Sequence, residues 1–154
     1  MPKPVTVTID VPQDRERVYD FLDVMANHEA FTDHLMRDWE LSGPVRGVGS
    51  KARVHVKAMG VTDVVDIEVV DAQEPQRIVE RNVAQKAGRI GQGTYVLEPL
   101  PSGGTRIAFE YRWIETPLAD RLSAPLARAF MRRTNATAMR RLADRLAARE
   151  RAAA

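Results

Sequence analysis

The sequence of 154 residues contains no cysteine, which excludes disulfide bonds, thiolate catalysis and zinc sites built on thiolates. It also has no apolar run near the roughly 20 residues that a bilayer-spanning helix needs. The opening MPKPVTVTIDVP lacks the apolar core of a secretory signal, so we expect a cytoplasmic protein without stable membrane insertion. Apolar residues make up 44% and charged residues 29% of the chain, as in folded globular proteins. We therefore expect one domain over residues 1–154.

Side chains that bind metals or phosphates are also scarce. Only three histidines are present, and no two of them have the i, i+4 spacing of a helical metal site. His28 and His34 flank Glu29 and Asp33, which allows a metal cluster, but the favoured interpretation is that both histidines are surface or capping residues of a short helix. No glycine-rich loop opens a helix, as a phosphate site would require. We expect no metal, no cofactor and no nucleic-acid partner.

Most of the chain alternates apolar and polar residues with the period of two that is typical of a strand with one buried face. A helical period interrupts this pattern after the first strand, and the favoured interpretation is two short helices, the second over residues 27–34. The last element is a helix from residue 118 to about 149, followed by a tail, 149–154, that we expect to fray. The strands are expected at 5–11, 39–41, 50–58, 63–71, 77–83, 93–98 and 105–113.

The strand over residues 77–83 has no wholly apolar face. One register turns Glu80 and Asn82 inward and the other turns Arg81 inward. A strand of this kind lies at a sheet edge or lines a wet cavity, because a buried polar group without a partner is costly.

The last two strands form a hairpin around the turn at residues 101–104. A register that pairs Leu97 with Ile107 places two aromatic residues opposite glycines, which either is a packing device or leaves space for a ligand. The other pairs in this register are Tyr95 with Phe109, Gly93 with Tyr111 and Gly91 with Trp113.

The long helix has two apolar faces that point in different directions. The first runs from Leu118 to Phe130 and the second from Met131 to Leu146, and we expect a kink near Pro125, where they meet. From Pro117 onward the chain has nine arginines against three acidic residues. The favoured interpretation is a solvated basic face, and the alternative is a surface that docks on a partner or an anionic membrane.

The order of these elements resembles the START-related lipid-transfer and polyketide cyclase (SRPBCC) superfamily, which has the helix-grip fold. The residues that carry the resemblance are Ile9-Asp10-Val11-Pro12 with Val18-Tyr19-Asp20-Phe21-Leu22, Gly47-Val48-Gly49-Ser50, Gly93-Thr94-Tyr95 and Gly103-Gly104-Thr105-Arg106-Ile107. The fold class expected is α+β, with a curved antiparallel sheet of six to seven strands gripping the C-terminal helix. The resemblance implies that a hydrophobic small molecule binds between the sheet and the helix.

Three functions are compatible with this sequence. The first is a carrier or sensor that binds a lipid, a polyketide-like or an aromatic molecule, as a monomer or homodimer; the second is a polyketide cyclase or dehydratase; the third is a docking module that uses the arginine-rich helix. No catalytic residue set can be assigned, although Tyr19 is placed to reach the same space as the ligand. The residues expected to bind the ligand are Tyr95, Phe109, Tyr111, Trp113, Gly93, Arg81, Leu122, Leu126 and Phe130.

Overall fold

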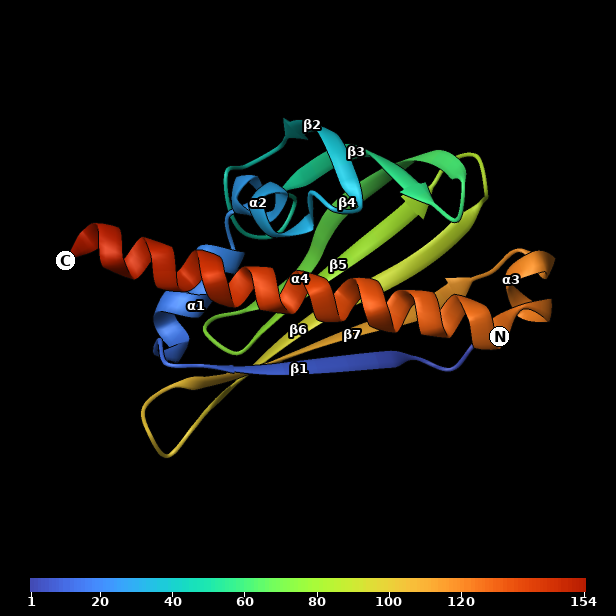
Figure 1. Cartoon of the computed structure of the whole chain (residues 1–154). Coiled ribbons are helices and arrows are strands. Elements are labelled where there is room, and N and C mark those ends of the chain that lie inside the picture. The colour runs from blue at the N-terminus through green and yellow to red at the C-terminus, as the bar shows by residue number, and fades with distance from the viewer.

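The computed structural model describes residues 1–154 and contains one seven-stranded antiparallel sheet, with a long helix across its concave face (Figure 1). The strands lie in the order β1-β7-β6-β5-β4-β3-β2, so that the last strand, β7, pairs with the first, β1. This arrangement confirms the predicted α+β helix-grip fold. The strands are β1 (Val5–Val11), β2 (Met36–Ser42), β3 (Lys51–Ala58), β4 (Val61–Gln73), β5 (Arg77–Ala84), β6 (Arg89–Pro99) and β7 (Thr105–Glu115).

Short helices follow the first strand, as predicted. The first is α1 (Arg15–Leu22), which begins where the Asp14 carboxylate accepts a hydrogen bond from the Arg17 amide at 2.9 Å. The second consists of a 3₁₀ turn, η1 (Met25–His28), that runs directly into one turn of α-helix, α2 (Glu29–Thr32). These elements cover one end of the sheet beside the C-terminal half of the long helix (Figure 1).

The sheet curves because its middle strands contain bulges and tight turns. The β4–β5 ladder shifts register between Val69 and Asp71, and a bulge of this kind bends a strand. The β3–β4 hairpin turns at Met59 and Gly60, whose φ angles of 49° and 80° match the twist of the flanking strands. The curvature leaves a concave face that one helix can cover only in part.

The C-terminal helix is broken near its start. A short helix, α3 (Leu118–Leu122), ends at Ser123, and α4 (Ala124–Ala153) begins directly after it. Pro125 therefore lies in the first turn of α4, where its missing amide hydrogen costs nothing. The predicted kink is present as a break slightly before Pro125, whereas the helix continues to Ala153 instead of ending near Arg149.

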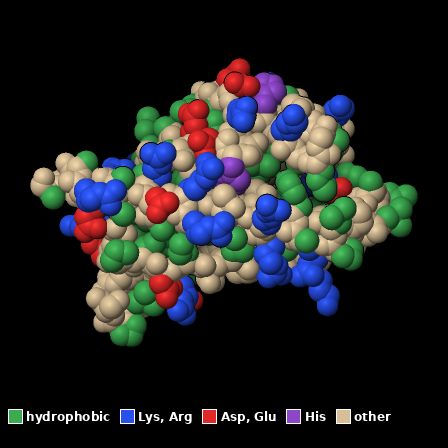
Figure 2. Space-filling model, in the orientation of Figure 1, with side chains coloured by type: hydrophobic (Ala, Val, Ile, Leu, Met, Phe, Trp, Pro, Cys, Tyr) green, Lys and Arg blue, Asp and Glu red, His purple; other side chains and the backbone are tan.

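One face of α4 packs on the sheet and the opposite face is basic. Ala138, Met139, Leu142 and Leu146 are buried in the core, which confirms the second predicted apolar face. Lysine and arginine side chains line the outer face of the helix, as expected for a solvated surface (Figure 2). No helix of the protein combines the length and the apolarity needed to cross a bilayer.

Candidate functional site

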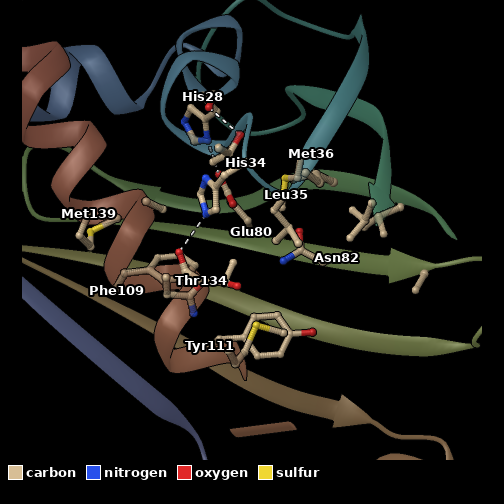
Figure 3. A pocket seen from close by; sticks show the side chains of 18 of the residues that line it. His28, His34, Leu35, Met36, Glu80, Asn82, Phe109, Tyr111, Thr134 and Met139 are labelled. Atoms are coloured by element: carbon tan, nitrogen blue, oxygen red, sulfur yellow. Dashed lines mark hydrogen bonds and ion pairs between the residues drawn. The ribbon is translucent and has the colours of Figure 1, made fainter. Parts of the chain in front are cut away.

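A cavity of about 120 Å³ lies between the concave face of the sheet and α4, and we name it the inner chamber (Figure 3). It is lined from β3 to β7 on the sheet side, from the η1–β2 segment above and from α4. A second cavity of about 250 Å³, the outer chamber, shares six of its lining residues and extends toward α3 and the β3–β4 turn. The shared residues are Leu35, Val56, Val65, Ala84, Arg89 and Met131.

Two glycines of β6 lie beneath aromatic rings that line the inner chamber. The predicted register is confirmed, with Gly93 paired to Tyr111 and Gly91 to Trp113. The rings lean diagonally, however, so that a Cβ on Gly93 would lie 2.9 Å from Phe109 Cζ and a Cβ on Gly91 2.2 Å from the Tyr111 hydroxyl oxygen. The glycines thus leave room for the rings, and the rings form the cavity wall.

A histidine and a glutamate meet at the deep end of the inner chamber. His28 Nδ1 lies 3.3 Å from Glu80 Oε1, and both side chains are more than nine-tenths buried (Figure 3). His28 Nε2 lies 2.7 Å from the Leu22 carbonyl oxygen. Because a carbonyl only accepts, Nε2 carries a hydrogen, so Nδ1 of the neutral ring faces Glu80 as an acceptor.

The environment of Glu80 favours its protonated form. Burial raises the pKa of the Glu80 carboxyl, and the His28 imidazole opposes this effect. Burial also raises the pKa of Tyr95 well above its ordinary value and that of Tyr111 to about 12, so both phenols keep their protons. The inner chamber therefore contains proton donors at neutral pH, set in a largely apolar wall.

A second histidine, from the same η1–β2 segment, faces the same space. His34 Nε2 donates to the Thr134 carbonyl oxygen of α4 at 3.1 Å (Figure 3). Burial lowers the pKa of His34, which favours the neutral ring with Nδ1 as a free acceptor. The link between His34 and α4 closes the upper wall of the inner chamber.

The outer chamber is covered by α3, which a single ion pair ties to the sheet. Arg89 Nε lies 2.5 Å from Asp120 Oδ2, and a second guanidinium nitrogen lies 2.9 Å from Asp120 Oδ1. Both side chains are largely buried, at 29% and 15% exposure. Leu118 and Leu122 of α3 are exposed, so this ion pair is the main attachment that α3 has to the sheet.

Replacing Asp120 by alanine should loosen α3 with little loss of global stability. We expect the free energy of unfolding to fall by about 1 kcal/mol, the scale of one partly exposed ion pair. Amide hydrogen exchange of residues 118–122 should become at least several-fold faster, as measured by mass spectrometry. Asp144→Ala, an exposed site on α4, is the matched control. Unchanged exchange over 118–122 in Asp120→Ala would show that the ion pair does not hold α3.

The structure brings most of the sequence-predicted ligand residues to the two chambers. Tyr95, Phe109 and Tyr111 line the inner chamber, and Trp113 and Phe130 line the outer one. Gly93 lies on the inner face beneath the Phe109 ring.

Three predicted positions lie outside the chambers. The Arg81 side chain is exposed on the convex face, because β5 turns Glu80 and Asn82 inward instead. Leu122 and Leu126 are 78% and 60% exposed. The break at Ser123 separates Leu122 from α4, and α4 turns Ala127 inward instead of Leu126. None of these three predicted ligand residues lines a chamber, and the facing of residues 77–83, which the sequence left open, is the one that turns Glu80 and Asn82 inward.

His28 stands at the N-cap position of α2, but its side chain makes no capping hydrogen bond. The interpretation of His28 as a surface residue is wrong, since the side chain is buried against Glu80. Its partner comes from a distant strand, so no local spacing could have identified the pair. The ambiguous polarity of residues 77–83 was the available signal, because an inward Glu80 needs a buried partner. Tyr19 is buried in the main core and does not line either chamber.

The fold is shared by proteins of known structure. The Zhui aromatase/cyclase from Streptomyces sp. R1128 superposes with a TM-score of 0.75 at 16% identity, over 99% of this chain and 98% of that one. The protein TTHA0849 from Thermus thermophilus gives 0.72 at 19% identity, over 95% and 98% of the two chains. A protein from Rhodobacter sphaeroides gives 0.65 at 24% identity, over 94% and 92%.

A comparison with curated proteins finds no match. A family model described as "Polyketide cyclase / dehydrase and lipid transport" matches residues 3–149, which is nearly the whole chain. The match agrees with the helix-grip fold, the two-chamber cavity and the resemblance found in the sequence. The chain therefore belongs to the polyketide cyclase/dehydrase and lipid transport family, within the SRPBCC superfamily.

Proposed function

We propose that this protein binds a hydrophobic small molecule in the inner and outer chambers and acts as its carrier or sensor. The observation that carries the proposal is the cavity itself: 13 of the 21 residues around the inner chamber are hydrophobic, and the space continues into the outer chamber. Largely apolar walls with a few polar groups are typical of small-molecule sites. The Zhui neighbour, an aromatase/cyclase, supports a polyketide-like or aromatic ligand over a long unbranched lipid.

Native mass spectrometry tests this proposal. The protein as purified, or after incubation with a mixture of neutral polycyclic aromatic compounds and phospholipids, should carry one small molecule per chain that is lost on denaturation. A bare protein mass after both treatments, from a sample that is folded by circular dichroism, would overturn the proposal. The mass of the released molecule would give its chemical class directly.

A second candidate is an enzyme of the cyclase or dehydratase type, and the Glu80–His28 pair favours it. A buried carboxyl group with a raised pKa that borders a cavity is suited to general acid–base catalysis. In such an enzyme Glu80 would exchange a proton with the substrate while His28 orients the carboxyl group. Glu80→Gln should then retain binding and lose at least about 100-fold in turnover, the lower end of general acid–base contributions. A carrier would release the bound molecule unchanged in the wild type.

A further inference from the structure

Several polar atoms in the wall of the inner chamber have no hydrogen-bond partner. Most of the buried side-chain polar atoms that lack a hydrogen-bond partner belong to residues that line this cavity, where a ligand could bind to them. An unsatisfied buried polar atom costs about 1–3 kcal/mol, so a ligand that matches these atoms recovers that cost. The atoms are His34 Nδ1, Trp39 Nε1, Glu80 Oε1, Asn82 Oδ1 and Asn135 Nδ2.

The chemistry of these atoms restricts the ligand. Asn82 Oδ1 and the bare His34 Nδ1 accept hydrogen bonds, and Trp39 Nε1 and Asn135 Nδ2 only donate. The protonated Glu80 carboxyl group can do both. A carboxylate only accepts, so it would leave Asn82 Oδ1 and His34 Nδ1 unmatched, and it would bring a charge into a largely apolar cavity. A cationic amine only donates, so it would leave Trp39 and Asn135 unmatched. A hydroxyl group does both.

The size and walls of the inner chamber point to a ring. An apolar protein cavity of about 150 Å³ can hold benzene, and the inner chamber is about 120 Å³. Its walls include the rings of Tyr95 and Phe109, whose centroids lie 4.7 Å apart, and the ring of Tyr111. Flat aromatic walls favour a planar ligand that stacks or packs edge to face.

The Glu80 carboxyl group lines the inner chamber beside these aromatic walls. Glu80 is 5% exposed, and its Oε2 lies 3.7 Å from the position that a Cβ on Gly93 would take, beside the Phe109 ring. Neither carboxyl oxygen accepts a hydrogen bond from the protein, and His28 Nδ1 lies 3.3 Å from Oε1. His28 thus contacts one oxygen of the carboxyl group, and the group remains available to a ligand in the cavity.

We propose that the inner chamber is a subsite for a neutral ring that carries a hydroxyl group, and that Glu80 is the residue that selects the hydroxyl over a carboxylate. The hydroxyl group hydrogen-bonds Glu80, and the rest of the ligand extends past Met131 into the outer chamber. This inference rests on the proposed function, because it assigns a head group to the same ligand.

Three probes of matched shape test the inference: 2-naphthol, 2-methylnaphthalene and 2-naphthoate. Isothermal titration calorimetry should show that 2-naphthol binds at least about tenfold more tightly than either of the others, the scale of one hydrogen bond to a buried group. Glu80→Leu should reduce the advantage over 2-methylnaphthalene to less than threefold. Arg81→Leu, the next residue on the same strand but on the exposed face, is the matched control and should behave as the wild type. Asn82→Leu provides a second inward variant, expected to cut the same advantage at least threefold, if Glu80→Leu does not fold.

The outcomes separate the inference from the proposed function. Equal binding of 2-naphthol and 2-methylnaphthalene, or stronger binding of 2-naphthoate, overturns the hydroxyl subsite and leaves the cavity as a binding site. An undiminished preference for 2-naphthol in folded Glu80→Leu overturns the role of Glu80. Failure of all three probes to bind the folded wild type counts against the proposed function as well.

Discussion

Replacing Gly93 by leucine should lower the affinity for a neutral aromatic probe such as N-phenyl-1-naphthylamine by at least about tenfold. A Cβ at this position would lie 2.9 Å from Phe109 Cζ, and the longer leucine side chain would point toward Glu80. The Phe109 ring lines the inner chamber, so a shift of the ring would reduce a cavity of only about 120 Å³. Overpacking of this kind also costs about 1–3 kcal/mol of stability.

The control for this variant is Gln92→Leu. Gln92 precedes Gly93 on β6 and faces away from the inner chamber, so the same leucine placed there should leave probe affinity within twofold of the wild type. Both affinities are measured by fluorescence titration of samples whose folding is checked by circular dichroism. A folded Gly93→Leu protein with wild-type affinity would place the ligand elsewhere.

Replacing His28 by leucine should destabilise the protein by about 3 kcal/mol at pH 7. Removal of one partner from a buried pair leaves the other, here Glu80, without its compensating group, which typically costs about 3–5 kcal/mol. Glu80 can avoid part of this cost by keeping its proton. The double variant His28→Leu/Glu80→Leu should recover most of the loss, because replacing both partners by apolar residues is often close to neutral.

The loss of stability caused by His28→Leu should increase with pH. Burial raises the pKa of Glu80 above its ordinary value of 4.5, and His28 is the group that opposes the rise. Below pH 4.5 Glu80 is protonated in both the folded and the unfolded chain, so its titration does not change the free energy of unfolding. As the pH rises above it, the unfolded chain releases the proton and the folded chain retains it, so stability falls. The difference in the free energy of unfolding between the wild type and His28→Leu should therefore be smallest near pH 4 and grow toward pH 7.

Urea unfolding at pH 4.5, 6 and 7.5 measures this effect. His55→Leu is the matched control, because His55 is about half exposed and its loss should change stability by less than about 0.5 kcal/mol at each pH. A deficit in His28→Leu that is independent of pH, or that the added Glu80→Leu change does not relieve, would contradict the assigned pairing.

The sequence predicts the sheet well because its strands bury one face each. Alternation places Ala52, Val54, Ile67 and Val69 on the inner face, and all four are buried. The short turn near Gly103 leaves little freedom in the β6–β7 register, which is observed as predicted. Local period and turn length are enough to decide these features.

The site is less predictable, because its decisive contacts join distant segments. Periodicity cannot choose between Glu80 and Arg81 as the inward residue, since each register buries a charge. The choice depends on His28, which reaches Glu80 only after η1 folds over the sheet. Similarly, the placement of Leu122 assumes an unbroken helix through Ser123, and the observed break removes that basis. Leu126 lies within α4, but the helix turns Ala127 inward instead.

The intrinsic fluorescence of the two tryptophans tests the central claim, that one ligand occupies both chambers, most directly. Trp39 lines the inner chamber and Trp113 the outer one, and the chain has no other tryptophan. Titration with N-phenyl-1-naphthylamine should quench both residues together and saturate at one probe per chain, with Trp39→Phe and Trp113→Phe each retaining quenching of the remaining tryptophan. Quenching that does not saturate, or that involves neither tryptophan, would contradict the assignment of the two chambers as the ligand site.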